Sequence, residues 1–304
     1  MSPDSSRLGR ITVLTNPASG HGGATHAAER AIAQLHHRGL DVVAIAGTDV
    51  DHARRLVEGA LDRGMDALVV VGGDGIVSLA LQVLAGNDIP LGIIPAGTGN
   101  DHAREFGIPT RSPEAAADVV VDGVVETVDL GRIVGADGTQ RWFGTVMAAG
   151  FDSLVTDRTN RMTWPHGRMR YNVAMLAEIS KLRLLPFRLT FDGEELVTDL
   201  TLAAFGNTRS YGGGMLICPD ADHADGKLDV TMVQSASRAK LVRLFPTVFK
   251  GTHVELDQVR TARASVITVE CAGINAYADG EYVCPLPVEV SAVPGALRIL
   301  RPAR

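Results

Sequence analysis

Three glycine-rich segments, each of which follows a short apolar run, carry the clearest chemical signal in the sequence. They are residues 16–23 (NPASGHGG), 72–75 (GGDG) and 95–101 (PAGTGND). Glycine lets backbone N–H groups approach an anionic oxygen because no Cβ intervenes, and a helix that starts after such a loop adds partial positive charge. Short polar side chains in the first and third segments supply further donors. The three segments together predict a site for the phosphates of a nucleotide.

Neither common nucleotide-binding fingerprint is present. The sequence has no GxxxxGK[ST], and a GxGxxG that starts at Gly97 fails because His102 stands where the last glycine is required. Glycine is also common in ordinary tight turns, which remain the alternative for any single segment. Asp74 has two compatible interpretations: an N-cap for the following helix, or a carboxylate that orients a metal-bound nucleotide.

Residues 1–125 alternate strand and helix patterns, which predicts a nucleotide-binding α/β domain. Strands are expected at residues 11–15, 41–46, 67–71 and 91–94, and helices at 24–37, 51–63, 76–85 and from about residue 100. This rhythm indicates a parallel sheet with helices on both faces. All three glycine segments then fall at the carboxyl ends of strands, where open parallel sheets bind ligands.

Residues 126–304 change pattern and predict a β-rich antiparallel domain with one or two helices, whose final strands return to the first domain. Strands are expected at residues 126–133, 142–148, 187–191, 196–205, 228–233, 265–270, 288–293 and 296–300, and helices at 169–182 and 238–249. On spacing alone, Asp279-Gly280 indicates a hairpin turn. Asp222 and Asp225 stand three apart in a loop, a spacing that suits a hard cation with oxygen ligands.

Composition excludes several classes of protein. The chain has 304 residues, 45% of them hydrophobic, which is enough for a packed core and argues against disorder. The net charge of −6 argues against a nucleic-acid partner, and no apolar run approaches the ~20 residues of a membrane span. Three cysteines without CxxC spacing and a short polar N-terminus predict a cytoplasmic protein without a signal peptide.

The glycine segments resemble a known family when they are taken together. GGDG at 72–75 combined with GTGND at 97–101 resembles the diacylglycerol kinase catalytic domain of lipid kinases, a distant relative of NAD kinases and 6-phosphofructokinases. The resemblance, to the soluble bacterial type found in actinobacteria, runs nearly end to end. It continues through NPxSG at 16–20, GFD at 150–152, the segment 219–229 and DGE at 279–281.

The resemblance implies roles for particular residues. Asp279 would be the proton acceptor for the lipid hydroxyl, and Mg²⁺ would be held by the Asp225 carboxylate with the carbonyls of His223 and Lys227. Asp222 and His223 depart from the family pattern, which has Lys and Leu there. ATP would be contacted by residues of the glycine loops and by one at the end of the second strand: Asn16, Ser19, Gly20, Thr48, Gly72, Gly73, Asp74, Gly75, Thr98, Gly99 and Asn100.

The activity that the resemblance implies is ATP-dependent phosphorylation of diacylglycerol to phosphatidic acid, with residues 126–304 as the lipid-substrate domain. Alternatives are a kinase of a sphingoid base or monoacylglycerol, an NAD kinase, and a non-catalytic nucleotide-binding protein. Residues 157–188 and 236–250 combine Arg and Lys with bulky apolar side chains, a pattern that suits an anionic membrane surface. We therefore expect peripheral association with the inner face of the membrane. Ordinary amphipathic packing on the sheet and a homodimer interface stay open as alternatives.

Overall fold

The computed structural model describes residues 8–15, 23–150, 184–234 and 245–303, and the single residues Arg158, Met162 and Trp164. The chain divides into two compact units, Met1–Val128 with Gly295–Arg304, and Asp129–Pro294. It passes from one unit to the other within β5 (Val124–Gly135) and within β16 (Val288–Arg301). No helix in the described part of the chain is long and apolar enough to cross a bilayer.

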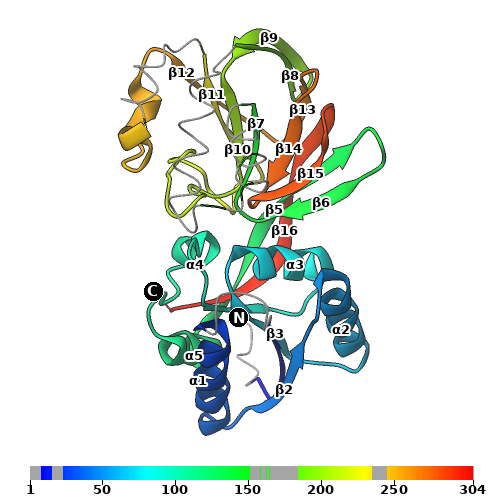
Figure 1. Cartoon of the computed structure of the whole chain (residues 1–304), viewed down its shortest axis with the longest axis vertical. Coiled ribbons are helices and arrows are strands. Elements are labelled where there is room, and N and C mark those ends of the chain that lie inside the picture. Colours follow the sequence, from blue (N-terminus) through cyan, green and yellow to red (C-terminus); the bar gives the residue numbers. More distant parts are fainter. Residues whose placement is uncertain are drawn as a thin grey trace, which may run out of the picture. The chain divides into compact units, whose positions relative to one another are not determined.

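The first unit is built on parallel strands in the order β2-β1-β3-β4-β16 (Figure 1). Its other strands are β1 (Arg10–Thr15), β2 (Asp41–Ala46), β3 (Ala67–Gly72) and β4 (Leu91–Pro95). Every residue of β3 and β4 is buried, as expected for central parallel strands covered on both faces. The loops after β3 and β4 therefore emerge side by side at one edge of the sheet.

Helices cover both faces of this sheet. They are α1 (Gly23–His37), α2 (Val50–Asp62), α3 (Asp74–Leu84), α4 (Asp101–Glu105) and α5 (Pro113–Asp122). α1 packs against α5 and α2 packs against α3, and Figure 1 shows these pairs on opposite sides of the strands. Arg30 of α1 and Arg38, directly after this helix, form ion pairs with Glu114, Asp118 and Asp122 of α5.

The second unit consists of antiparallel strands in two sheets. One has the order β12-β11-β10-β7-β14-β15, and the other contains β8, β9, β13 and β16 with the β5-β6 hairpin. The strands are β6 (Gln140–Phe143), β7 (Val146–Gly150), β8 (Leu185–Phe191), β9 (Glu194–Leu200), β10 (Leu202–Gly206), β11 (Leu228–Val233), β12 (Val259–Ala264), β13 (Val266–Glu270), β14 (Asn275–Ala278) and β15 (Glu281–Pro285). A 3₁₀ helix, η1 (Thr252–Glu255), precedes β12.

The core of this unit follows from strand alternation. Leu228 and Val230 of β11 lie in a large apolar cluster with Phe187 of β8, so the two sheets pack face to face. Asp229 and Thr231 alternate with them and lie on the opposite face of β11. A parallel-sheet α/β unit plus an antiparallel β unit is the fold class that the sequence predicted, and this prediction is confirmed.

The predicted strand boundaries were wrong in two instructive places. Residues 142–148, expected as one strand, are β6 and β7, which belong to different sheets and are separated by Gly144 and Thr145. Residues 196–205 likewise divide at Thr201 into β9 and β10. The sequence pattern does not reveal such breaks, because apolar residues continue on both sides of each one.

Other differences are simpler. The predicted strands 288–293 and 296–300 form one strand, β16, while α5 and β12 were not predicted. The predicted helix 169–182 lies outside the described residues, and of the helix 238–249 only residues from 245 onward are described, with helix at 245–248.

Candidate active site

The glycine loops after β3 and β4 are in direct backbone contact. A Cβ added to Gly97 would lie 2.4 Å from the Cα of Gly73, and one added to Gly73 would lie 3.1 Å from the Cα of Gly97. The N–H of Ala96 also donates to the carbonyl of Gly72 at 2.8 Å. The predicted meeting of these two loops at one sheet edge is thus present, and it requires the absence of side chains at both contact positions.

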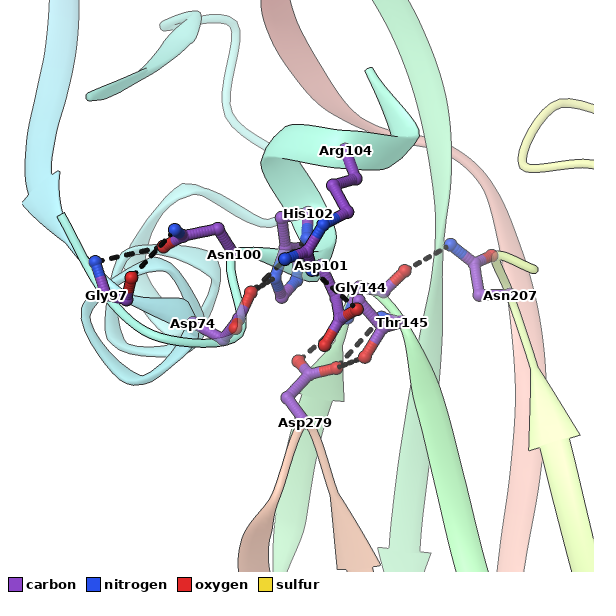
Figure 2. A network of polar contacts seen from close by, with 10 residues as sticks. All are labelled: Asp74, Gly97, Asn100, Asp101, His102, Arg104, Gly144, Thr145, Asn207 and Asp279. Atoms are coloured by element: carbon purple, nitrogen blue, oxygen red, sulfur yellow. Dashed lines mark hydrogen bonds and ion pairs between the residues drawn. The ribbon is translucent and has the colours of Figure 1, made fainter. Parts of the chain in front are cut away.

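Asn100 shapes the second of these loops. Its backbone is left-handed (φ 53°), its Oδ1 accepts the N–H of Gly97 at 3.0 Å, and its Nδ2 donates to the carbonyl of Gly97 at 2.9 Å (Figure 2). Asparagine tolerates the left-handed region better than most residues. The predicted ATP contact at Asn100 therefore coincides with a side chain that closes the loop on itself, whereas the neighbouring Thr98 is exposed.

Asp74 is the first residue of α3, and Gly73 is the N-cap. The N-cap interpretation of Asp74 is thus wrong by one residue. Its carboxylate faces His102 in α4: Oδ1 accepts the backbone N–H of His102 at 3.3 Å and lies 3.1 Å from Nδ1 (Figure 2). Burial raises the pKa of Asp74, but the hydrogen bonds and charge of His102 outweigh it, so the pKa is lowered from its ordinary value.

The remaining predicted nucleotide contacts are spread along the same sheet edge. Gly75 is exposed in the first turn of α3, and Gly99 lies against Asp74, where a Cβ would be 2.5 Å from Oδ2. Thr48 follows the edge strand β2, and its hydroxyl donates to Asp49, the N-cap of α2, at 3.0 Å. β1 separates this strand from β3. The loop after β1, with Asn16, Ser19 and Gly20, lies outside the described residues.

Asp279 occupies the turn of the β14-β15 hairpin. Both Asp279 (φ 50°) and Gly280 (φ 81°) have positive φ, as a two-residue type I′ turn requires, so the hairpin predicted from spacing is confirmed. The Asp279 carboxylate is buried and accepts three hydrogen bonds (Figure 2). Gly144 N–H donates to Oδ2 at 3.0 Å, while the N–H and hydroxyl of Thr145 donate to Oδ1 at 2.8 and 2.6 Å.

The strand break between β6 and β7 supplies these donors. Gly144 and Thr145 are released from the sheet ladder, so their N–H groups point to Asp279 instead of to a neighbouring strand. Asn207, just after β10, holds the same turn, because its Nδ2 donates to the carbonyls of Gly144 and Asp129, each at 3.0 Å. The sequence did not indicate roles for Thr145 and Asn207, because the apolar pattern of residues 142–148 gives no sign that the strand ends between β6 and β7.

The predicted magnesium ligands are adjacent in the turn before β11, and the oxygens of two of them, Asp225 and His223, already have partners. The Asp225 carboxylate accepts the N–H of Lys227 at 2.9 Å and forms an ion pair with Arg263 of β12. The His223 carbonyl accepts the N–H of Asp129 at 2.7 Å. A guanidinium therefore stands where a divalent cation would meet Asp225, and this arrangement does not fit Mg²⁺.

Two family models match the chain, one for each half. Residues 10–133 match the diacylglycerol kinase catalytic domain, and residues 145–301 match the YegS C-terminal NAD kinase beta sandwich-like domain. The α/β unit with its glycine loops and the β unit with its buried hairpin carboxylate thus belong to the class of lipid kinases with an NAD kinase-like second domain.

Individual relatives agree with the models. The chain is 69% identical over 296 residues to a "Diacylglycerol kinase" of Mycobacterium tuberculosis, covering 97% of this chain and 96% of that protein. It is 34% identical to a "Probable lipid kinase YegS-like" of Stenotrophomonas maltophilia, covering 88% and 90%. A crystal structure of a diacylglycerol kinase from Bacillus anthracis shares the fold, with a TM-score of 0.73, 20% identity and 97% of both chains covered. The chain belongs to the diacylglycerol kinase family of lipid kinases, which confirms the resemblance.

Proposed function

We propose that this lipid kinase transfers the γ-phosphate of ATP to the free hydroxyl of diacylglycerol and so forms phosphatidic acid. The observation that carries the proposal is the 69% identity, over nearly the whole chain, to a relative named diacylglycerol kinase. The buried carboxylate of Asp279 supports it, because the reaction needs a group that accepts the hydroxyl proton.

In this proposal Asp279 acts on the lipid hydroxyl. As the hydroxyl oxygen bonds to the γ-phosphorus, the bond from phosphorus to the ADP oxygen breaks and the hydroxyl proton passes to the Asp279 carboxylate. Hydrogen bonds from Gly144 and Thr145 favour the ionised carboxylate and fix its orientation. Much of the catalytic effect is then positioning.

The glycine loops form the nucleotide side of the proposal. The loops at Gly73 and Gly97 carry no Cβ, and the N-terminus of α3, an 11-residue helix, starts directly after the first of them. Backbone N–H groups and a helix N-terminus suit the phosphates of ATP, so these residues fit the nucleotide. Mg²⁺ enters the proposal as part of the Mg-ATP substrate, and no step is assigned to a metal at Asp225.

We also propose that the kinase reaches its lipid by peripheral contact with an anionic bilayer. The described end of the basic segment 236–250 supports this, because Phe249 is 46% exposed beside the exposed Lys250. In the other basic segment, 157–188, Trp164 is 75% exposed. Charge reversal at Arg238 and Arg243 should weaken binding to anionic vesicles, and unchanged binding would remove this segment from the contact. Cytoplasmic location and a homodimer remain predictions from the sequence.

The decisive assay follows labelled γ-phosphate from Mg-ATP in mixed micelles, with wild type and Asp279→Asn run in parallel. Sphingosine, monoacylglycerol and NAD are offered beside diacylglycerol. Labelled phosphatidic acid that disappears in Asp279→Asn is the expected result. Label on another acceptor would replace the substrate, and no transfer to any acceptor with ATP still bound would favour a non-catalytic binding protein.

A further inference from the structure

A buried histidine, His102, follows the glycine loop after β4 and lies beside Asp74, which follows the glycine loop after β3. The side chain of His102 is 3% exposed, and it occupies the first turn of α4, directly after the GTGND segment. Its Nδ1 is 3.1 Å from Asp74 Oδ1, which also accepts the backbone N–H of His102 at 3.3 Å. One residue thus supplies two polar contacts to one carboxylate oxygen.

The protonation of this pair follows from chemistry. The lowered pKa of Asp74 keeps the carboxylate ionised at neutral pH, and an ionised carboxylate only accepts hydrogen bonds. Nδ1 of His102 must therefore carry a proton and donate it to Asp74. The charged neighbours of the imidazole on its own helix are Asp101 and Arg104, which pair with each other at 3.3 Å.

The other carboxylate oxygen of Asp74 is confined from the opposite side. A Cβ on Gly99 would lie 2.5 Å from Oδ2, so the backbone of the Gly97–Gly99 loop packs directly on this oxygen. Oδ1 is held by His102 and Oδ2 rests on Gly99, which leaves Asp74 a single orientation. Without the imidazole, Asp74 keeps only backbone donors opposite Gly99, and the N–H of His102 lies at the longer distance of 3.3 Å from Oδ1.

We propose that His102 is a positioning residue, which holds the Asp74 carboxylate in the orientation that the bound nucleotide requires. The inference rests on the proposed function, since it deepens the role of the same nucleotide site. His102 touches no substrate in this proposal and acts only through Asp74.

The test compares His102→Leu with His102→Asn. Asparagine keeps a neutral N–H donor near the position of Nδ1, whereas leucine fills space without a donor. His102→Leu should raise KM for ATP by about 10- to 100-fold, the effect expected when a charged group loses a hydrogen bond, with KM for diacylglycerol unchanged. His102→Asn should restore KM for ATP to within about threefold of wild type, and the exposed His36→Asn on α1 serves as control.

A double-mutant cycle with Asp74→Asn tests whether the effect of His102→Leu on KM for ATP depends on the Asp74 carboxylate. If His102 acts through Asp74, then His102→Leu adds little further loss in the Asp74→Asn background. Full additivity, an unchanged KM for ATP in His102→Leu, or equal loss in the leucine and asparagine variants would each overturn the proposal. Thermal unfolding of every variant separates these results from misfolding.

The proposed function and this inference fail in different ways. Should wild type phosphorylate no lipid, the proposed function fails, but the dissociation constant for a fluorescent ATP analogue still compares the variants. Weaker binding in His102→Leu and recovery in His102→Asn would then uphold the positioning role alone. Equal dissociation constants in wild type and His102→Leu would overturn it.

Discussion

Two carboxylates, one in each unit, are held by different kinds of donor. Asp279 accepts the backbone N–H groups of Gly144 and Thr145 together with the Thr145 hydroxyl. Asp74 accepts the imidazole and the backbone N–H of His102. Both carboxylates therefore rest on main-chain N–H groups, including that of Asp101 for Asp74, and on one side-chain donor, which is a hydroxyl for Asp279 and an imidazole for Asp74.

This difference determines where each site is sensitive to mutation. Backbone N–H groups remain in place whatever side chain is attached, so the orientation of Asp279 survives most substitutions around it. Asp74 shares its sensitivity with His102, because replacing the imidazole removes the side-chain donor and leaves only backbone donors to the carboxylate. We therefore expect the largest functional losses at Asp279 itself and smaller, distributed losses around the glycine loops.

The largest effect is expected for Asp279→Asn. The amide cannot accept the hydroxyl proton, and its NH₂ group would face the donors of Gly144 and Thr145, so kcat should fall by about 10³-fold. KM for ATP should change little. Initial rates over a range of ATP and diacylglycerol concentrations measure both parameters. Glu281→Gln, exposed at the start of β15, is the matched control and should behave as wild type; wild-type kcat in Asp279→Asn would remove Asp279 from the proton-accepting role.

Gly97→Ala tests the backbone contact between the two glycine loops. Its Cβ would lie 2.4 Å from the Cα of Gly73, a backbone atom that cannot rotate away. The substitution should lower the free energy of unfolding by about 1–3 kcal/mol, as overpacking does, and should raise KM for ATP. Chemical denaturation monitored by circular dichroism gives the first value.

Gly59→Ala is the matched control because its outcome should have the opposite sign. Gly59 lies within α2, and an added Cβ would meet only the end of the flexible Arg63 side chain at 3.4 Å. Alanine is favoured over glycine in helices by about 1 kcal/mol, so stability should rise. If Gly97→Ala were as stable as Gly59→Ala, the contact between the loops would not be required.

Thr145→Val should have a smaller effect than Asp279→Asn. Valine removes the hydroxyl that donates at 2.6 Å but preserves shape and the backbone N–H at 2.8 Å. We expect kcat to fall about tenfold, the equivalent of one lost hydrogen bond to a charged group. Thr145→Ser retains the hydroxyl and should recover most of the rate. A loss in Thr145→Val as large as that in Asp279→Asn would contradict the dominance of backbone donors.

Much of the nucleotide-binding unit was predictable from sequence. Its strands are short, apolar and separated by glycine loops, so periodicity alone locates them, and parallel order brings Gly73 and Gly97 together. The helix α5 was missed although Ser112 caps it and Pro113 stands at its first turn, a recognised start signal.

The surroundings of Asp279 were less predictable. The hairpin follows from Asp279-Gly280, but the donors come from 134 and 135 residues away. They exist because the chain passes from one sheet to the other at Gly144 and Thr145, and no local pattern marks such a change. His102 was seen in sequence only as a departure from a glycine fingerprint; its contact with Asp74 arises when α3 and α4 pack together.

A third carboxylate, Asp225, has a guanidinium as its partner, in place of the hydroxyl beside Asp279 or the imidazole beside Asp74. Arg263 forms an ion pair with Asp225 and also donates to Asp229 at 3.1 Å. Because arginine stays charged at all ordinary pH values, it gives Asp225 and Asp229 a positive partner without a metal. The melting temperature of the wild type should therefore differ by less than about 1 °C between EDTA and excess Mg²⁺, since only a ligand of the folded state raises it.

Arg263→Gln should create the metal response that the wild type lacks. Without the guanidinium, Asp225 and Asp229 face each other's charge, and added Mg²⁺ should raise the melting temperature of the variant. Arg188→Gln on β8 is the matched control, since Arg188 is similarly half-exposed and pairs with Glu195 at 2.7 Å. It should lose a little stability and gain no response to Mg²⁺. A clear rise of the wild-type melting temperature with Mg²⁺ would instead support the magnesium ligands predicted from sequence, and Arg263 would then have to move away from Asp225.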